Sequence, residues 1–262
     1  MKTPSLSTIR AITLMVAAGL LICMVALALI PIAMVTLFRA RRLYNRIATQ
    51  LARAILWIWN VRVVLHIEHP FPEGQTIFIS NHSSTLDSFV LPALGLPNTR
   101  FFLTGALRKW IPFGIIAYLM GTFFTVPQSR RDERVRFFQR SEGTLRRTGE
   151  SAYLSPEGGR ITTGEIGHFN KGAFHLATSL KAPIVPLYFQ IPAEIDPGRG
   201  FNAKAGTMHI YVKPPVDTRL WRIEELEQNK EYVREMFVRW HRENREIDYA
   251  SAQLPDAVII HS

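Results

Sequence analysis

A long apolar segment near the start of the chain limits its possible folds more than any other feature. From Ala11 to Phe38 nearly every residue is apolar, and only Thr13, Gly19, Pro31 and Thr36 interrupt the run. A helix needs about 20 such residues to cross a bilayer, so this segment is long enough. It is too long for the apolar region of a secretory signal, and arginines follow where a cleavage site would lie. Residues 1–38 are therefore predicted to be a membrane anchor, either spanning the bilayer or forming a hairpin bent at Pro31 within one leaflet.

Charged residues flanking this segment predict its orientation. Lys2 and Arg10 precede it, whereas five arginines follow it closely: Arg39, Arg41, Arg42, Arg46 and Arg53. By the positive-inside tendency, the domain after the anchor is expected on the cytoplasmic side of the membrane. The lone cysteine, Cys23, lies inside the apolar segment, so an intrachain disulfide is excluded.

The net charge of +10 raises the question of a nucleic-acid partner. The positive residues form several clusters rather than one tail, and no recognised nucleic-acid-binding motif accompanies them. Anionic lipid headgroups attract such clusters by about 1 kcal/mol per charge near the surface. With an apolar anchor alongside, membrane lipids are the predicted partner and nucleic acid is not.

Residues 39–60 have the pattern of an amphipathic helix. Apolar residues recur every three or four positions, and tryptophans stand near the end of the segment: Leu43, Ile47, Leu51, Ile55 and Ile58, with Trp57 and Trp59. Arginines opposite such a stripe are typical of a helix at a membrane interface. The same stripe also suits a helix packed on the domain, and the two arrangements are compatible.

Residues 61–246 alternate between strand-like and helix-like segments, and residues 247–262 form a tail without clear pattern. Strands are predicted at short apolar runs: 61–67, 76–80, 100–104, 122–126, 152–155, 182–189 and 207–212. Helices are predicted from Ser83 or Ser84, over 132–147, 172–180 and 223–245. This alternation predicts an α/β domain with a partly parallel central sheet flanked by helices.

The segment NHSSTLD, Asn81 to Asp87, directly follows a predicted strand and contains a histidine and a carboxylate. Such a pair is the minimum for a general base, because the carboxylate fixes the ring's tautomer and stabilises the imidazolium. Residues five apart do not meet within an ideal helix, but His82 and Asp87 can meet if the helix begins between them. Ser84 and Asp87 fit such a start, and the same residues also suit a plain capping role.

Other chemistries find less support around this histidine. Ser83 and Ser84 lie beside it, but the strained G-x-S-x-G elbow of a serine hydrolase is absent from the sequence. Neither a second histidine at helical spacing nor a cysteine cluster suggests a metal site.

The segment from Leu154 to Phe174, LSPEGGRITTGEIGHFNKGAF, follows another predicted strand. Its glycines allow close approach of the backbone to an anion, and Arg160 is suited to grip a phosphate. It lacks the G-K-[ST] of a P-loop, and a plain turn after a strand is the alternative.

Together, these two segments resemble the motifs of the glycerolipid acyltransferase family, which includes 1-acylglycerol-3-phosphate acyltransferases. NHSSTLD matches the family's N-H-x-x-x-x-D in full, and SPEGGR matches four of six positions of F-P-E-G-T-R, differing at Ser155 and Gly159. FNKGAF is similar to F-K-x-G-A-F with Lys171 displaced by one position. WIPFG and the proline-bearing IVPLYF also match, so the resemblance covers about Val61 to Val212.

The resemblance implies a reaction and roles for these residues. His82, oriented by Asp87, would deprotonate an acceptor hydroxyl that attacks the thioester of acyl-CoA or acyl-carrier protein. The acceptor, a lysophospholipid such as 1-acylglycerol-3-phosphate, would be positioned by the loop and by nearby cations: Glu157, Gly158, Gly159, Arg160, Arg130, Arg131 and Lys171. It implies neither a metal nor a tightly bound cofactor.

One departure bears on the acceptor. The family's second motif, G-x-x-F-x-x-R, ends in an arginine that helps hold the acceptor phosphate, whereas GTFFTVP places Pro127 there. Arg130 or Arg131 can substitute from a rearranged loop, or the acceptor carries a different headgroup, including that of an amino-acid-derived lysolipid. A lipid hydrolase and a catalytically silent membrane-binding protein are the other classes that the sequence leaves open.

Overall fold

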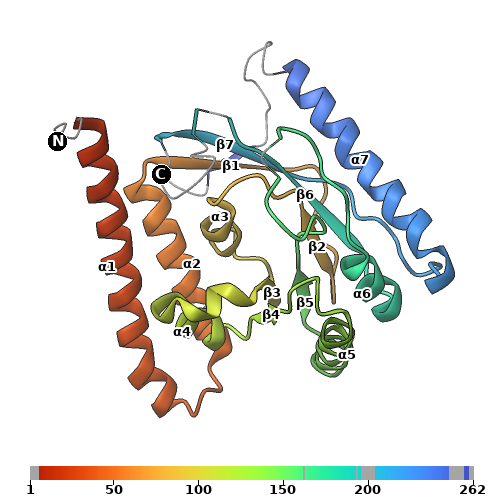
Figure 1. Ribbon diagram of the computed structural model, residues 1–262, viewed down its shortest axis with the longest axis horizontal. Helices are drawn as coiled ribbons and strands as arrows, with labels where there is room; N and C mark the ends of the chain where they lie inside the picture. The colour runs from red at the N-terminus through yellow and green to blue at the C-terminus, as the bar shows by residue number, and fades with distance from the viewer. Residues whose placement is uncertain (1–5, 162, 193, 196–203, 248–256, 260–262) are drawn as a thin grey trace.

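The computed structural model describes residues 6–161, 163–192, 194–195, 204–247 and 257–259, and is built on one eight-stranded sheet (Figure 1). The strand order is β4-β3-β5-β2-β6-β7-β1-β8, and among the described strands only the β6–β7 and β1–β8 pairs are antiparallel. The strands are β1 (Val61–Ile67), β2 (Ile77–Ser80), β3 (Thr99–Thr104), β4 (Phe123–Thr125), β5 (Ser151–Tyr153), β6 (Ile184–Gln190), β7 (Gly206–Val212) and β8 (Ala257–Ile259). The predicted α/β class with a partly parallel sheet is confirmed.

Helices cover both faces of the sheet, which explains why its central strands are apolar throughout. In β2, Phe78 points into the core beneath α1 to α4, whereas Ile77 and Ile79 point into the core beneath α5 to α7. The helices are α1 (Leu6–Val35), α2 (Arg41–Ile58), α3 (Asp87–Leu94), α4 (Ile111–Leu119), α5 (Arg131–Thr148), α6 (Gly172–Leu180) and α7 (Leu226–Ile247). The result is a three-layer molecule.

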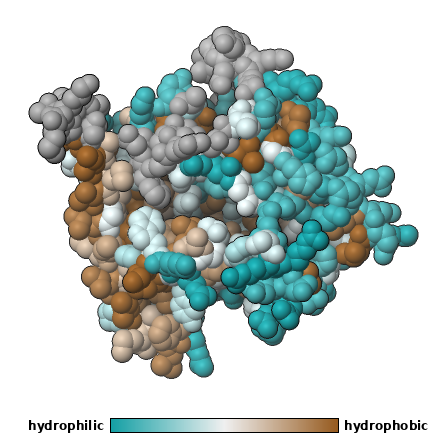
Figure 2. Space-filling view, viewed as in Figure 1, coloured by the Kyte–Doolittle hydropathy of each residue, from teal (hydrophilic) through white to brown (hydrophobic). Residues whose placement is uncertain are grey.

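The apolar anchor forms one helix rather than a hairpin, because α1 continues through Pro31. Within the described residues it alone is long and apolar enough to cross a membrane, from Ile9 to Val35. It lies along α2 and α4, and it buries a narrow stripe of mostly small residues: Ala18, Ile22, Ala26, Leu29 and Ala33. Its other faces are apolar and exposed, as the brown surface over α1 in Figure 2 shows.

The amphipathic helix α2 packs its apolar face on the domain. Tyr44, Leu51 and Ile55 are buried, and α2 contacts α3 and β1. The apolar stripe of this helix therefore packs on the domain, as one of the two predicted arrangements required. Leu43 and Trp57 are the exceptions, since both are exposed.

The first helix predicted within the α/β domain begins later than expected. The sequence favoured a start at Ser83 or Ser84, whereas α3 starts at Asp87. A turn precedes it, in which Ser84 Oγ accepts a hydrogen bond from the Leu86 N–H (3.1 Å) and Asp87 Oδ2 accepts one from the Ser84 N–H (3.4 Å). These side chains satisfy backbone donors before the helix, so the chain enters it one turn late.

One α-helix and one strand were not predicted from the sequence. Helix α4 contains Pro112 and Gly114, which read as helix breakers, although proline is well tolerated in a first helical turn. Strand β8 lies in the predicted tail, 247–262, and pairs antiparallel with β1. The rest of that tail after Ile247 lies outside the described residues.

Candidate active site

His82 and Asp87 meet at the carboxyl edge of the sheet, between the end of β2 and the start of α3. His82 Nδ1 lies 2.6 Å from Asp87 Oδ2. The Asp87 side chain is buried, whereas the His82 side chain is 29% exposed. Because a carboxylate only accepts hydrogen bonds, Nδ1 carries the proton and the lone pair of the neutral ring lies on Nε2. Nε2 is hydrogen-bonded to none of the described residues, so it can face a substrate.

The surroundings make His82 a stronger base than an ordinary histidine. Burial by itself lowers the pKa of His82, but the hydrogen bond and charge of Asp87 and the charge of Glu157 outweigh burial and raise this pKa. The positive charge of Arg160 opposes them. Since Asp87 stabilises the imidazolium, the pair is suited to accept a proton and return it.

Asn81 fixes the backbone next to His82, a role that the sequence motif alone did not reveal. Its side-chain amide donates to the Phe189 carbonyl (2.9 Å) and accepts from the Phe189 N–H (2.8 Å) in β6. Beside it, the Ser80 and Tyr153 hydroxyls are 2.7 Å apart. The end of β2 is thus tied to the neighbouring strands on both sides.

Glu157 holds the two loops of the site together. Glu157 Oε2 accepts a hydrogen bond from the His82 N–H (2.5 Å), and Oε1 accepts one from the Gly167 N–H (2.7 Å). The Ile161 N–H also donates to the His82 carbonyl (2.8 Å). Burial raises the pKa of Glu157, and the two backbone N–H groups counteract burial by stabilising the carboxylate. Each carboxylate oxygen accepts one backbone N–H, so Glu157 fixes the backbone at His82 relative to the second loop.

The two glycines after Glu157 have different requirements. Gly158 has a φ of +68°, and a Cβ there would lie 2.6 Å from Asn170 Nδ2 and 3.1 Å from Gln128 Nε2. Asn170 Nδ2 donates to the carbonyls of Pro156 and Glu157, both at 3.0 Å. A Cβ at Gly159 would meet no described atom within 4 Å. Glycine is therefore required at Gly158 but not at Gly159.

Arg160 is the predicted cation that lies close to the histidine–aspartate pair. Its positive charge acts on the His82 ring. Its Nη1 is buried and is hydrogen-bonded to none of the described residues. A buried donor of this kind favours an anionic or carbonyl ligand beside it.

The other predicted cations lie elsewhere. Arg130 and Arg131 are exposed at the start of α5, and Arg130 pairs with Glu133 at 3.4 Å in the same turn. Lys171 is 60% exposed and pairs with Glu227 of α7 at 2.9 Å. From the segment after β4, it is Gln128 that reaches the glycine loop.

Helix α7 supports the site from outside. Arg234 Nε donates to the Gly167 carbonyl (2.8 Å), and Nη2 donates to the Ile166 carbonyl (3.3 Å). The His241 ring lies 2.8 Å from the Gly164 carbonyl. Because Gly167 donates to Glu157 and Glu157 accepts from His82, these contacts connect α7 to the candidate base.

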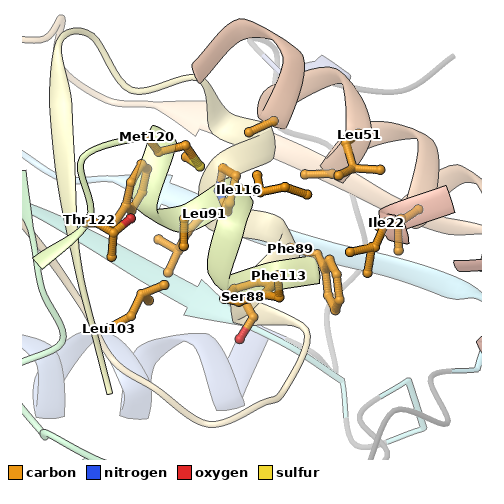
Figure 3. A pocket seen from close by; sticks show the side chains of 16 residues that line it. Ile22, Leu51, Ser88, Phe89, Leu91, Leu103, Phe113, Ile116, Met120 and Thr122 are labelled. Atoms are coloured by element: carbon orange, nitrogen blue, oxygen red, sulfur yellow. The ribbon is translucent and has the colours of Figure 1, made fainter. Parts of the chain in front are cut away.

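An apolar cavity of about 50 Å³ lies at the start of α3, where Ser88, the residue after Asp87, lines it (Figure 3). It begins at Ser88 and Phe89, which follow Asp87 on α3, and extends between α1, α2, β3 and α4. Its lining includes Ile22, Leu51, Leu91, Leu103, Ile116 and Met120. Such a lining suits an alkyl chain. Across the described part of the chain, no group of three or more metal-ligating side chains occurs.

The fold and the site define an α/β protein with a histidine–carboxylate pair at the carboxyl edge of its sheet, next to an apolar cavity. Residues 60–190, half of the chain, match the family model described as Acyltransferase. The chain belongs to this acyltransferase family, which confirms the resemblance seen in its motifs.

Two curated relatives support this placement. The 1-acyl-sn-glycerol-3-phosphate acyltransferase of Saccharomyces cerevisiae is 32% identical over 167 residues, covering 62% of this chain and 54% of the relative. The alpha form of the same enzyme from Homo sapiens is 28% identical over 169 residues, covering 63% of this chain and 58% of the relative. The matches therefore span little more than half the length of these relatives.

A solved structure has the same fold. The crystal structure of the 1-acyl-sn-glycerophosphate acyltransferase PlsC from Thermotoga maritima superposes with a TM-score of 0.73 at 17% identity, covering 94% of this chain and 97% of that one. The likeness includes nearly the whole chain, well beyond the residues that match the family model.

Proposed function

We propose that this protein is an O-acyltransferase that moves a fatty acyl group from acyl-CoA or acyl-carrier protein to the hydroxyl of a lysophospholipid. The acceptor proposed first is 1-acylglycerol-3-phosphate, which gives phosphatidic acid. The observation that carries the proposal is the 2.6 Å contact between His82 Nδ1 and Asp87 Oδ2, which leaves Nε2 available as a base, with an apolar cavity beginning at the next residue, Ser88.

This geometry supports the following reaction. Nε2 takes the proton of the acceptor hydroxyl while the hydroxyl oxygen attacks the thioester carbonyl carbon. The carbon–sulfur bond then breaks, and the thiolate leaves with the proton that the imidazolium returns. Asp87 stabilises the imidazolium between these steps. Neither a covalent acyl-enzyme nor a metal or tightly bound cofactor takes part.

The surroundings suggest where the substrates lie. The apolar lining of the cavity that begins at Ser88 and Phe89 supports it as the site of the acyl chain. The acceptor phosphate fits beside Arg160, whose buried Nη1 needs an acceptor. Gln128 offers a neutral donor where the family pattern has an arginine at Pro127, and this supports another lysolipid as the alternative acceptor.

The exposed apolar faces of α1 support a membrane location for the enzyme. α1 packs along α2 and α4, so a bilayer around α1 would also lie close to the apolar cavity. A lysolipid in the leaflet would then have a short path to His82. We place the α/β domain on the cytoplasmic side, because arginines follow α1.

The test is product formation by membranes that contain the protein. They are incubated with labelled acyl-CoA or acyl-carrier protein and a panel of lysolipids, and His82→Ala is compared with His168→Ala. His168 is an exposed histidine outside the histidine–aspartate pair, so it is the matched control. We expect a diacyl product that is lost in His82→Ala and kept in His168→Ala. Free fatty acid released without any acceptor, or equal activity of both variants, would contradict the proposal.

A further inference from the structure

A basic groove lies at the turn between α1 and α2. It is open, has a volume of about 650 Å³, and is lined by Arg39, Ala40, Arg41, Arg42, Leu43, Arg46, Asn98, Thr148 and Glu150. Asn98 precedes β3 and Glu150 precedes β5, so the groove lies at the amino edge of these strands. His82 and Glu157 follow the carboxyl ends of β2 and β5, on the opposite edge. The groove is therefore separate from the candidate active site.

Its charge is strongly positive. The acidic residue in the lining, Glu150, is already paired with both Arg41 and Arg100. Burial, then the charges of Arg100 and Arg42, lower the pKa of Arg41 to about 10, which leaves it charged at neutral pH. Arg41 Nε is buried and finds no acceptor among the described residues. The groove thus contains more guanidinium charge than its carboxylate can balance.

Three further arginines carry this excess: Arg39, Arg42 and Arg46 are exposed, and their side chains form no hydrogen bond or ion pair with described residues. The Asn98 and Thr148 side chains add polar groups to the same lining. Guanidinium groups offer several donors in a fixed plane, and they match the oxygens of a phosphate.

Large apolar side chains directly precede the groove arginines in the chain. Leu37 and Phe38 have φ values of 50° and 59°, in the left-handed region that bulky residues rarely adopt. They are 68% and 60% exposed, and Leu43 beside them is also exposed. The chain thus adopts a strained turn that presents two large apolar residues directly next to the arginines. A ligand that satisfies both features carries a phosphate and an alkyl chain.

We propose that the basic groove binds the phosphate of an anionic membrane phospholipid, whose acyl chains lie against Leu37, Phe38 and the exposed face of α1. The site is distinct from the one that takes the substrates. It holds the turn between α1 and α2 at the lipid headgroups, and it does not depend on turnover at His82.

The test measures binding rather than activity. The full chain in nonionic-detergent micelles is titrated with radiolabelled phosphatidylglycerol, and the bound lipid is counted. The triple variant R39Q/R42Q/R46Q is expected to bind at least about tenfold more weakly than the wild type, because three charges near the headgroup are lost. Binding by this variant that equals wild-type binding overturns the proposal.

Two control variants show whether the binding belongs to the groove itself. The variant R222Q/R239Q/R242Q removes three exposed arginines from α7 and the segment before it, and it is expected to bind like the wild type. An equal loss of lipid binding in this variant would mean that binding depends on the overall positive charge of the protein, and it would overturn the proposed site. His82→Ala is expected to keep binding, which distinguishes the groove from the catalytic site even if the transferase proposal fails.

Competition identifies the ligand. Excess phosphatidylcholine and inorganic phosphate are expected to displace little of the bound phosphatidylglycerol, because the first lacks net negative charge and the second lacks an acyl chain. Full displacement by millimolar inorganic phosphate would assign the groove to a free anion and overturn the lipid proposal.

Discussion

The two edges of the sheet differ in how firmly their charged side chains are held. At the carboxyl edge, His82 and Glu157 are each held by short hydrogen bonds from two segments of the chain, and Asp87 is held by the His82 ring. At the amino edge, Arg39, Arg42 and Arg46 are exposed and unpaired among the described residues. Chemistry needs fixed atoms, so the first edge is preorganised. A lipid headgroup supplies its own oxygens, so the second edge keeps its donors available.

Outside the histidine–aspartate pair itself, removing the carboxylate that joins the two loops should have the largest effect. In Glu157→Gln one oxygen becomes an NH2 group, which faces a backbone N–H donor. We expect kcat to fall on the order of 100-fold because His82 is displaced, and the free energy of unfolding to fall by about 1–3 kcal/mol. Steady-state kinetics and denaturant titration measure both, and Glu243→Gln, an exposed glutamate on α7, is the control. A mutant with full activity would show that the loops do not need this bridge.

The two glycines offer a matched pair for the next prediction. Gly158→Ala places a Cβ against Asn170 and keeps a positive φ, so we expect a loss of about 1–3 kcal/mol in stability together with roughly tenfold lower kcat. Gly159→Thr enters open space and should change neither quantity. Thermal denaturation and activity assays of both variants test this prediction. Equal effects at the two positions would refute the different requirements for glycine at Gly158 and Gly159.

Arg234 should matter less, because it acts through Gly167 and Glu157 as a positioning residue. We expect Arg234→Gln to lower kcat by about five- to tenfold with KM nearly unchanged. The variant loses the hydrogen bonds of Arg234 to the Gly167 and Ile166 carbonyls, so the position of Glu157 and His82 is less well fixed. Arg234→Lys should recover part of kcat, whereas the neighbouring exposed Arg239→Gln should have no effect. A rise in KM alone would place Arg234 in substrate binding instead.

The smallest effect is expected in the basic groove. Arg42 repels Arg41 and pairs with none of the described residues, so Arg42→Gln should change the free energy of unfolding by less than about 0.5 kcal/mol. Thermal denaturation of the full chain in detergent checks this. A clear loss of stability would mean that the groove arginines hold the fold, and the contrast between the two edges would disappear.

The sequence predicted most strands and the histidine–carboxylate pair, because both depend on local patterns. Short apolar runs predicted β1 to β7, and the chain turn before α3 allowed His82 and Asp87 to meet despite their spacing. Helix α4 was not predicted because Pro112 and Gly114 obscure its period. The full setting of the site also could not be predicted, because its partners come from distant segments. Asn81 and Phe189, for example, are 108 positions apart.

The predicted cations show the same limit. Arg160 lies near His82 as expected, whereas Arg130, Arg131 and Lys171 face other partners or solvent. Their distance from the His82 ring depends on how α5 and α6 pack, and a local sequence motif does not predict that packing. Gln128 and Arg234 reach the glycine loop and its neighbour from elements whose sequences carry no sign of that role.

The central claim is that Asp87 makes His82 a base, and the pH dependence of kcat/KM tests it most directly. Only neutral His82 accepts a proton, so activity falls as pH drops through the raised pKa of His82. In Asp87→Asn the pKa of His82 loses its two largest raising contributions, the hydrogen bond to the carboxylate and the carboxylate charge, while burial still lowers it. We predict that the acid limb moves to lower pH and that the plateau falls by about 10²- to 10⁴-fold. An unchanged acid limb with an unchanged plateau would contradict the account.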